Sequence, residues 1–201
     1  ARSWSWSAAP SLSASTLPAM RLLLLAALAA SACAPTAPAP ASADSSAAAI
    51  ASAPADSLAD RTEVEAAVAA TIEQEGIHVV HFWAPWCGNS RAEFEGGLYE
   101  VVEAHPDVTF SFVTIWTDGR DSADRLARYG IEASDRVFVY GQPDRGPSAD
   151  RDLRRRSFLG LPLSWTPTTW VFNREGTLAY AFNYGEVSNE MLALAIEHAR
   201  D

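Results

Sequence analysis

The sequence contains no lysine: its 15 basic residues are all arginine, against 25 acidic residues. The formal net charge is therefore −10 at pH 7. Nucleic-acid binding needs a basic surface that faces the phosphate backbone, so this charge argues against a nucleic-acid partner. We attribute the missing lysine to codon bias, which also fits the abundance of alanine, and not to a mechanism.

Motifs of several enzyme classes are also missing. The sequence has no glycine-rich phosphate loop, no G-x-S-x-G nucleophile motif and no internal repeat. Its four histidines are scattered and it has only two cysteines, so no group of residues has the spacing of a zinc site. We therefore expect neither a metal nor another cofactor.

Residues 1–33 have the pattern of an upstream segment and a processing signal. Met20 and Arg21 precede the apolar run 22–30, and small residues separate that run from Cys33. This order is typical of a secretory signal peptide. The run is far below the roughly 18 residues needed to span a bilayer. We expect Met20 to be the true start and residues 1–19 to be an upstream misreading.

Cys33 permits two interpretations. Residues 30–33, ASAC, resemble the lipobox of bacterial lipoproteins, in which the cysteine is lipidated, although leucine usually stands at the first position. They also fit the A-x-A site of ordinary secretion. We favour an extracytoplasmic lipoprotein facing the periplasm. The Ala/Pro/Ser-rich segment 34–59 cannot bury enough surface to fold, and it would serve as a flexible tether to a lipid anchor at the membrane.

From Asp60 to the end of the chain the pattern is that of one α/β domain, residues 60–201. The composition and periodicity predict helices at 62–74, 91–104, 121–129 and 189–200, and strands at 77–83, 108–116, 136–140, 168–172 and 177–182. The last two strands flank a turn and form a predicted hairpin. Strands that alternate with helices and end in a hairpin predict a central mixed sheet flanked by helices.

One cysteine lies where a predicted strand meets a predicted helix. Residues 81–90 read HFWAPWCGNS, so Cys87 is followed by Gly88, Asn89 and Ser90. A cysteine just before a helix meets unpaired backbone N–H groups and the positive end of the helix dipole, which favour the thiolate. The thiolate is the nucleophile of disulfide exchange. We therefore interpret Cys87 as a reactive thiol and not as an inert buried one.

Residues 79–88, VVHFWAPWCG, resemble the active-site segment of the thioredoxin superfamily. The RAE sequence at 91–93, together with TPTT at 166–169 and FNREG at 172–176, is similar to its extracytoplasmic TlpA/ResA-like branch. The resemblance covers about residues 62–200. It implies a thioredoxin-like fold, a cis bond before Pro167 that faces Cys87, and an insertion before this cis-Pro loop. A cis X–Pro bond costs only about 0.5–1 kcal/mol over trans.

The second cysteine of the family motif is absent, because Ser90 occupies its place in a CxxS motif. In the family, the first cysteine attacks a disulfide and the second resolves the mixed disulfide. Cys87 can therefore attack but cannot resolve the product by itself. Ser90 is either the trace of a lost dithiol or a hydrogen-bond donor to the Cys87 thiolate, and both interpretations stay open.

Other positions follow from the same resemblance. Beside the catalytic set Cys87, Ser90 and Pro167, it implies substrate contacts from Trp86, Gly88, Asn89 and Thr166, with Trp83 and Trp86 walling the sulfur. His81 occupies the strand position where thioredoxins carry a buried acid, and it is either a core histidine or an acid/base group. Glu95 replaces a helix-kinking proline and is followed by Gly96-Gly97, a local softening of the helix.

Two functions compete. The first is a monothiol thiol-disulfide oxidoreductase that forms mixed disulfides with a protein disulfide or a low-molecular thiol and depends on an external reductant. The alternative is a non-catalytic lipoprotein that binds a peptide or partner protein in the cis-Pro groove. Arg154-Arg155-Arg156 in the insertion form either a solvated helix face or a grip for an acidic partner. Trp165 and Trp170 either pack in the core or contact a peptide.

Overall fold

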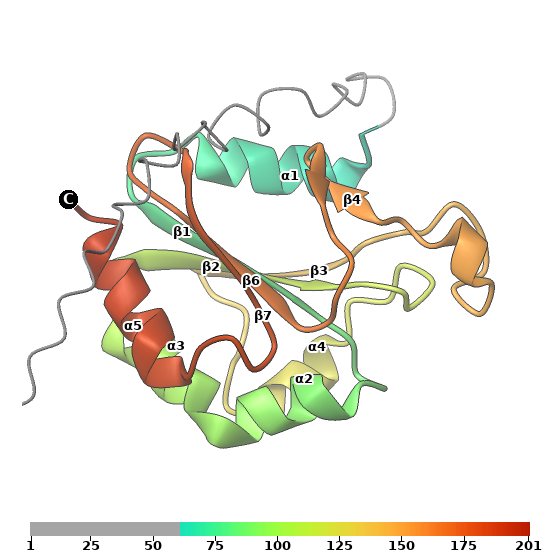
Figure 1. The fold of residues 1–201 in the computed structure, drawn as a ribbon, viewed down its shortest axis with the longest axis horizontal. Helices are drawn as coiled ribbons and strands as arrows, with labels where there is room; N and C mark the ends of the chain where they lie inside the picture. Colours follow the sequence, from blue (N-terminus) through green and yellow to red (C-terminus); the bar gives the residue numbers. More distant parts are fainter. Residues whose placement is uncertain (1–60) are drawn as a thin grey trace, which may run out of the picture. The chain divides into compact units, whose positions relative to one another are not determined.

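The computed structural model describes residues 61–201, which form a five-stranded mixed sheet with helices on both faces (Figure 1). The strand order is β3-β2-β1-β6-β7. The bounds are β1 Ile77–Trp83, β2 Val108–Thr114, β3 Val137–Gly141, β6 Thr168–Phe172 and β7 Leu178–Asn183. β1 and β3 run parallel to β2, whereas β6 is antiparallel to β1 and to β7. This arrangement confirms the predicted thioredoxin-like α/β fold.

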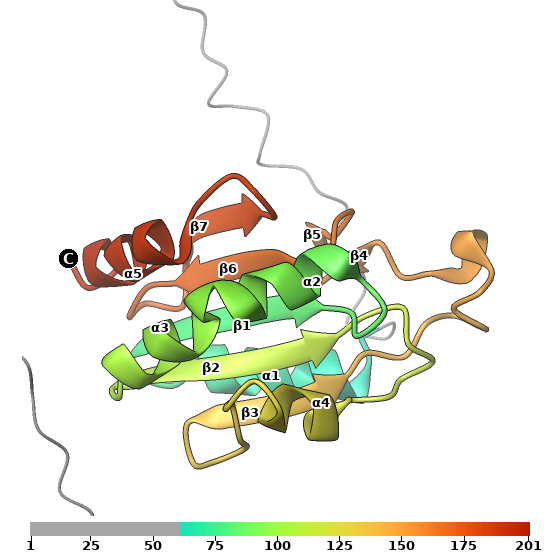
Figure 2. The same cartoon turned by 90° about the horizontal axis from the view of Figure 1, so that it is seen from below.

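The helices cover the two faces of the sheet unequally (Figures 1 and 2). One face carries α1 (Glu63–Ile72) and the other carries the remaining α-helices. These are α2 (Gly88–Glu93), α3 (Tyr99–Ala104), α4 (Ala123–Ala127) and α5 (Asn189–His198), with the π-helical turn η3 (Phe94–Leu98) between α2 and α3. No helix among residues 61–201 is long and apolar enough to cross a membrane. The signal peptide, Cys33 and the linker 34–59 lie outside the described residues.

The central strand β1 is buried along its whole length. Val79 and Trp83 pack into the cluster beneath α3 and α5, whereas Val80 and Phe82 pack into the cluster beneath α1. Because successive side chains of a strand point to opposite faces, a strand covered on both faces must be apolar at nearly every position. This explains why apolar residues in the run 77–83 occupy both faces of the strand and do not alternate with exposed polar residues.

The helix that contains the site is kinked at a glycine. Gly97 has φ +105° inside the turn η3, a backbone conformation that residues with a side chain rarely adopt. The helix is therefore kinked at Gly97, within the Gly96-Gly97 pair where the sequence predicts a local weakening of the helix. Here glycine is present in place of the helix-kinking proline of the family that the sequence resembles.

The insertion between β3 and β6 contains the short helix η4 (Arg151–Leu153) and a small hairpin, β4 (Ser157–Phe158) and β5 (Leu161–Pro162). Phe158 is fully buried against Phe82, with ring centroids 4.9 Å apart. Glu65 at the start of α1 accepts a bond from the Leu159 N–H at 2.9 Å, so the insertion is fastened to the domain. The interpretation of residues 154–156 as a solvated helix face is wrong, because η4 ends before them and Arg154 is extended.

Candidate functional site

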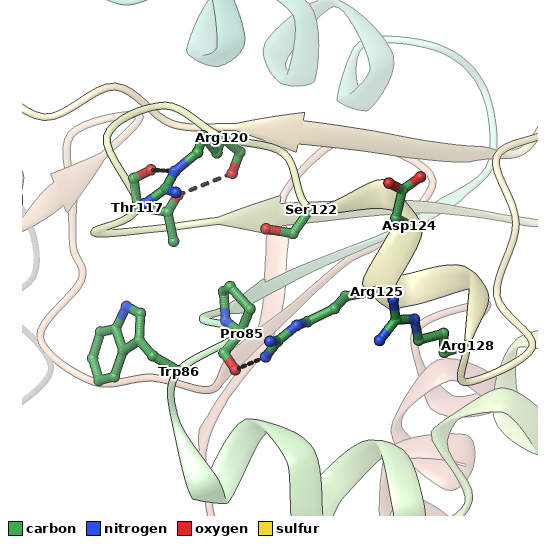
Figure 3. Close-up of a pocket in the computed structure, with 8 residues that line it drawn as sticks. All are labelled: Pro85, Trp86, Thr117, Arg120, Ser122, Asp124, Arg125 and Arg128. Carbon is green, nitrogen blue, oxygen red and sulfur yellow. Dashed lines mark hydrogen bonds between the residues drawn. The ribbon is translucent and has the colours of Figure 1, made fainter.

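Cys87 lies in the segment that joins β1 to α2. Its N–H donates to the Ala84 carbonyl at 2.9 Å, and its own carbonyl accepts from the Arg91 N–H at 3.2 Å, which begins the helix. The Arg125 guanidinium of α4 donates to the Pro85 carbonyl and ties this segment to α4 (Figure 3). The thiol of Cys87 is free and partly buried.

The bond between Thr166 and Pro167 is cis, as predicted. Phe82 pairs with Thr168 across β1 and β6, so the cis-Pro loop lies at the same end of the sheet as Cys87. The Cys87 Sγ is 3.4 Å from the Thr166 carbonyl oxygen, to which it donates. This contact belongs to the thiol, since a thiolate has no proton to donate. Pro167 itself is buried, and its carbonyl accepts from the Tyr184 N–H at 3.1 Å.

Ser90 is buried one helical turn after Cys87, with 1% of its surface exposed. Its Oγ accepts from the Ala84 N–H at 3.1 Å and lies 3.4 Å from the Thr166 Oγ1. The hydroxyl thus bonds with its own loop and with the cis-Pro loop and not with the Cys87 sulfur. This geometry favours the trace of a lost dithiol over the thiolate donor.

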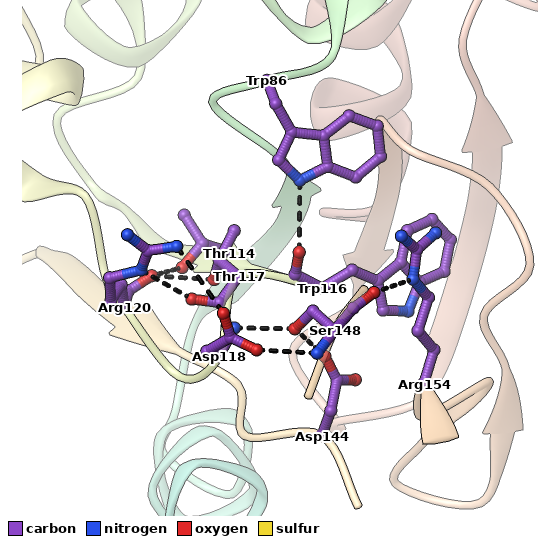
Figure 4. A network of polar contacts seen from close by, with 9 residues as sticks. All are labelled: Trp86, Thr114, Trp116, Thr117, Asp118, Arg120, Asp144, Ser148 and Arg154. Atoms are coloured by element: carbon purple, nitrogen blue, oxygen red, sulfur yellow. Dashed lines mark hydrogen bonds and ion pairs between the residues drawn. The ribbon is translucent and has the colours of Figure 1, made fainter. Parts of the chain in front are cut away.

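Trp86 is the exposed neighbour of the thiol, with 56% of its surface accessible. Its Nε1 donates to the Trp116 carbonyl at 3.1 Å (Figure 4). The Arg154 guanidinium lies 5.7 Å from the Trp86 ring centroid and 5.4 Å from that of Trp116, within the range of cation–π attraction. The Arg154 Nε also donates to the Ser148 carbonyl at 2.7 Å, so the insertion reaches the edge of the site.

The other tryptophans divide between core and surface. Trp83 is 1% exposed and packs edge-on against Phe94, so its side chain belongs to the core. Trp170 is likewise in the core at 2%, whereas Trp165, next to the cis-Pro loop, is 65% exposed. Trp83 lies on the same face of β1 as Val79, and because both faces of this strand are covered, a side chain on either face is buried.

Gly88 and Asn89 are exposed in the first turn of α2, beside Cys87. Thr166 is half-buried between Cys87 and Ser90. The four residues predicted to contact substrate, Trp86, Gly88, Asn89 and Thr166, thus lie around the thiol. Among residues 61–201, no group of three or more His, Cys, Asp or Glu side chains is arranged to hold a metal ion.

His81 is enclosed by the core. Burial lowers its pKa from 6.5 to about 3, so the ring is neutral at ordinary pH. Its Nδ1 lies 2.9 Å from the Thr169 Oγ1, and the ring stands edge-on to Phe94 and Phe112. Within residues 61–201, its Nε2 has no hydrogen-bond partner. A neutral histidine with one unpaired nitrogen resembles a core residue more than a proton carrier for the Cys87 sulfur.

Glu93 is a titratable group that the sequence reasoning did not single out. It lies three residues after Ser90 on α2, and burial raises the pKa of its carboxyl from 4.5 to about 7. Its Oε2 has no hydrogen-bond partner in the described part of the chain, residues 61–201. The three-residue spacing from Ser90 was the available signal, because residues three apart share a helix face. Glu93 therefore gains or loses a proton near neutral pH beside the buried hydroxyl.

Neither a family model nor a curated protein matches the chain. Among solved structures it is similar to a secreted disulfide oxidoreductase of Mycobacterium tuberculosis, with 21% identity, 64% of this chain and 85% of that chain covered, and a TM-score of 0.45. It is also similar to a DsbF homologue of Corynebacterium diphtheriae, at 24% identity over 64% of this chain and 74% of that chain, TM-score 0.45. A thio-disulfide isomerase of Thermus thermophilus matches at 27% identity over 65% and 82%, TM-score 0.44.

Proposed function

We propose that this protein is a monothiol thiol-disulfide exchange protein in which Cys87 forms mixed disulfides. The observation that carries the proposal is the position of its partly exposed sulfur, at the start of α2 and 3.4 Å from the carbonyl next to the cis-Pro bond. A helix start favours a thiolate, and access by a second sulfur requires exposure.

The reaction balances with one external thiol. The Cys87 thiolate attacks one sulfur of a disulfide, a new S–S bond forms, and the other sulfur leaves as a thiolate that takes a proton from water. Because Ser90 has no thiol, a low-molecular thiolate must then attack the mixed disulfide and release the Cys87 thiolate. One S–S bond breaks for each one that forms, so the exchange has no net electron demand.

The proposal is tested by intact-mass analysis after incubation with oxidised glutathione. The protein carries Cys33→Ser, so that Cys87 is its only thiol. We expect one glutathione adduct that forms at least about ten times faster than on N-acetylcysteine at the same pH and persists until reduced thiol is added. Cys87→Ser is the control and should form none. A native protein that reacts no faster than N-acetylcysteine would contradict the proposal.

Peptide binding without catalysis is the second candidate, and exposed aromatic residues favour it. Trp86, Trp165 and Tyr184 border the Cys87 and Pro167 loops and are 56%, 65% and 44% exposed. Aromatic side chains of this kind are enriched in protein interfaces. Retention of a peptide ligand by Cys87→Ser, together with an unreactive native thiol, would favour this function.

We propose further that the protein acts outside the cytoplasm, anchored through Cys33. The support is the short apolar run 22–30 and the Ala/Pro/Ser-rich segment after the cysteine. The Cys33→Ala variant should move from the membrane fraction to the soluble fraction. A wild-type protein already in the soluble fraction would favour plain secretion.

A further inference from the structure

A basic pocket lies on the side of the Cys87 segment that faces α4. It has a volume of about 430 Å³, and its lining includes Pro85 and Trp86 from that segment and Arg120, Arg125 and Arg128 from the β2–α4 region (Figure 3). Asp124 is the one acidic side chain in its lining. Three permanent positive charges thus face one carboxylate beside the two residues that precede Cys87.

The positive charge of this pocket is only partly compensated, by Asp124 in its lining and by Asp118 beside Arg120. The nearest ion pair, Arg120 with Asp118, is long at 3.7 Å and exposed on both sides. The ion pairs of residues 61–201 include none for Arg125 or Arg128. Arg125 is held by a neutral acceptor, the Pro85 carbonyl, which fixes its guanidinium at the wall of the pocket.

These arginines form a basic region on a chain whose net charge is negative. The formal net charge is −10, so a random surface patch would repel an acidic partner. Arg154 directly follows η4 in the insertion, and its guanidinium adds a further cation beside the Trp86 ring. Trp86, the exposed neighbour of the thiol, therefore has Arg154 near its ring and shares a pocket with three further arginines, in a chain of net negative charge.

We infer that the pocket binds an acidic peptide segment next to the disulfide that Cys87 attacks, and so selects disulfides flanked by carboxylates. The inference rests on the proposed exchange function and specifies its substrate class. Arg guanidinium groups bind carboxylates through paired N–H donors, and Trp86 offers an apolar surface for the adjoining peptide.

The test compares three blocked tripeptides in which cysteine is flanked by Glu, Gln or Lys on both sides, each as its symmetrical disulfide. Rates of mixed-disulfide formation on Cys87 are measured by intact mass in the Cys33→Ser protein. Each rate is divided by that of the same peptide with 2-mercaptoethanol, which removes differences in intrinsic reactivity. We expect the Glu peptide to react about tenfold faster than the Gln peptide at low ionic strength, the Lys peptide to be slowest, and the preference to shrink in roughly 0.5 M salt.

Variants assign the preference to the pocket. Arg128→Gln should lower the Glu-to-Gln rate ratio about two- to threefold, and Arg120→Gln with Arg128→Gln should lower it further. Arg174→Gln removes the same charge in the β6–β7 turn, at the opposite end of β6 from the cis-Pro loop, and should leave the ratio unchanged.

Equal normalised rates for the Glu and Gln peptides would overturn the inference and leave the exchange function standing. A ratio that is unaffected by the double variant would do the same, since the preference would then arise elsewhere. If no peptide forms an adduct, the exchange function fails, and the inference that rests on it fails as well.

Discussion

The two sides of the Cys87 segment differ in how they hold charge. The inner side is defined here as His81, Ser90 and Glu93. His81 and Ser90 are buried and Glu93 is half-buried, and burial shifts both titratable groups toward their neutral forms. The outer side, defined as Trp86 with Arg120, Arg125 and Arg128, keeps its charges at the surface. Burial penalises the ionised form, whereas solvent sustains it.

This difference separates two kinds of response. Changes of pH should act on the inner side, because His81 and Glu93 exchange protons between about pH 3 and about pH 7. Changes of salt should act on the outer side, because exposed charges are screened within about 10 Å at 0.1 M ionic strength. A variant on one side should therefore leave the response of the other side intact.

The largest expected effect is that of replacing Ser90, on the inner side, by cysteine. Ser90 lies one helical turn after Cys87, and a disulfide requires Cα atoms about 4.4–6.8 Å apart, a separation that one turn of helix provides. We expect Ser90→Cys to form an internal disulfide with Cys87 and to reduce insulin in the presence of dithiothreitol roughly 100-fold faster than the Ser90 protein. Loss of the bond from the Ala84 N–H should cost only about 1 kcal/mol of stability.

Asn89→Cys is the matched control for this gain. It adds a thiol one residue earlier, on an exposed position that does not face Cys87, because residues two apart point to different sides of a helix. Equal rates of insulin reduction by the two variants would show that any nearby thiol suffices and that the thiol need not lie at the buried position of Ser90.

The next largest effect concerns His81. Its folded-state pKa of about 3 lies below the unfolded value of 6.5, so the unfolded state binds more protons in between and stability falls as pH drops through this window. Between pH 6.5 and 4.5 the loss is on the order of 2–3 kcal/mol. The double variant His81→Leu, Thr169→Val removes both bonded partners and should lack this loss in urea unfolding. Thr169→Val alone keeps the imidazole, so parallel curves for the single and double variants would refute the assignment.

Much of the frame of this site was predictable from the sequence. The strand at 77–83 was predicted with the bounds of β1, because a central strand buried on both faces leaves a mostly apolar run, here interrupted by His78 and His81. The cis bond before Pro167 was implied by the family resemblance and is present. These features depend on local sequence, or on a motif whose residues stand at fixed positions relative to one another.

The remaining features depend on contacts that no local pattern encodes. The β4–β5 hairpin was missed because its strands have two residues each, too few for periodicity, and its turn places Leu159 and Gly160 at positive φ. The stacking of Arg154 on Trp86 joins residues 68 positions apart, and the basic pocket joins two separate loops. Contacts between residues so far apart in the sequence can be identified only in the folded structure.

Glu93 gives the third prediction, with a pH dependence opposite in sign to that of His81. The folded-state pKa of about 7 lies above the unfolded value of 4.5, so the folded state binds more protons in between and stability falls as pH rises. We expect Glu93→Gln to gain roughly 2 kcal/mol over the wild type between pH 5 and pH 8 in urea unfolding, somewhat below the full linkage value because the carboxyl is partly solvated. Glu95→Gln, at an exposed position of the same helix, is the control. A pH-independent difference between Glu93→Gln and the wild type would contradict the raised pKa.

The smallest effect concerns the outer side, where Arg154 stacks near Trp86. A double-mutant cycle of Arg154→Met with Trp86→Leu should give a coupling energy of about 0.5–1 kcal/mol in urea unfolding, the range for an exposed cation–π pair. Methionine keeps the unbranched stem of the side chain and replaces the guanidinium group, so the coupling reports the contact of the cation with the ring and not that of the stem. The cycle of Arg154→Met with Trp165→Leu is the control, because Trp165 is an exposed tryptophan near the site for which no stacking with Arg154 is found among residues 61–201. Equal coupling in both cycles would mean that the insertion does not fix Trp86 through this pair. A pH-independent coupling between pH 5 and pH 8 would agree with an outer side that does not share the proton exchange of the inner side.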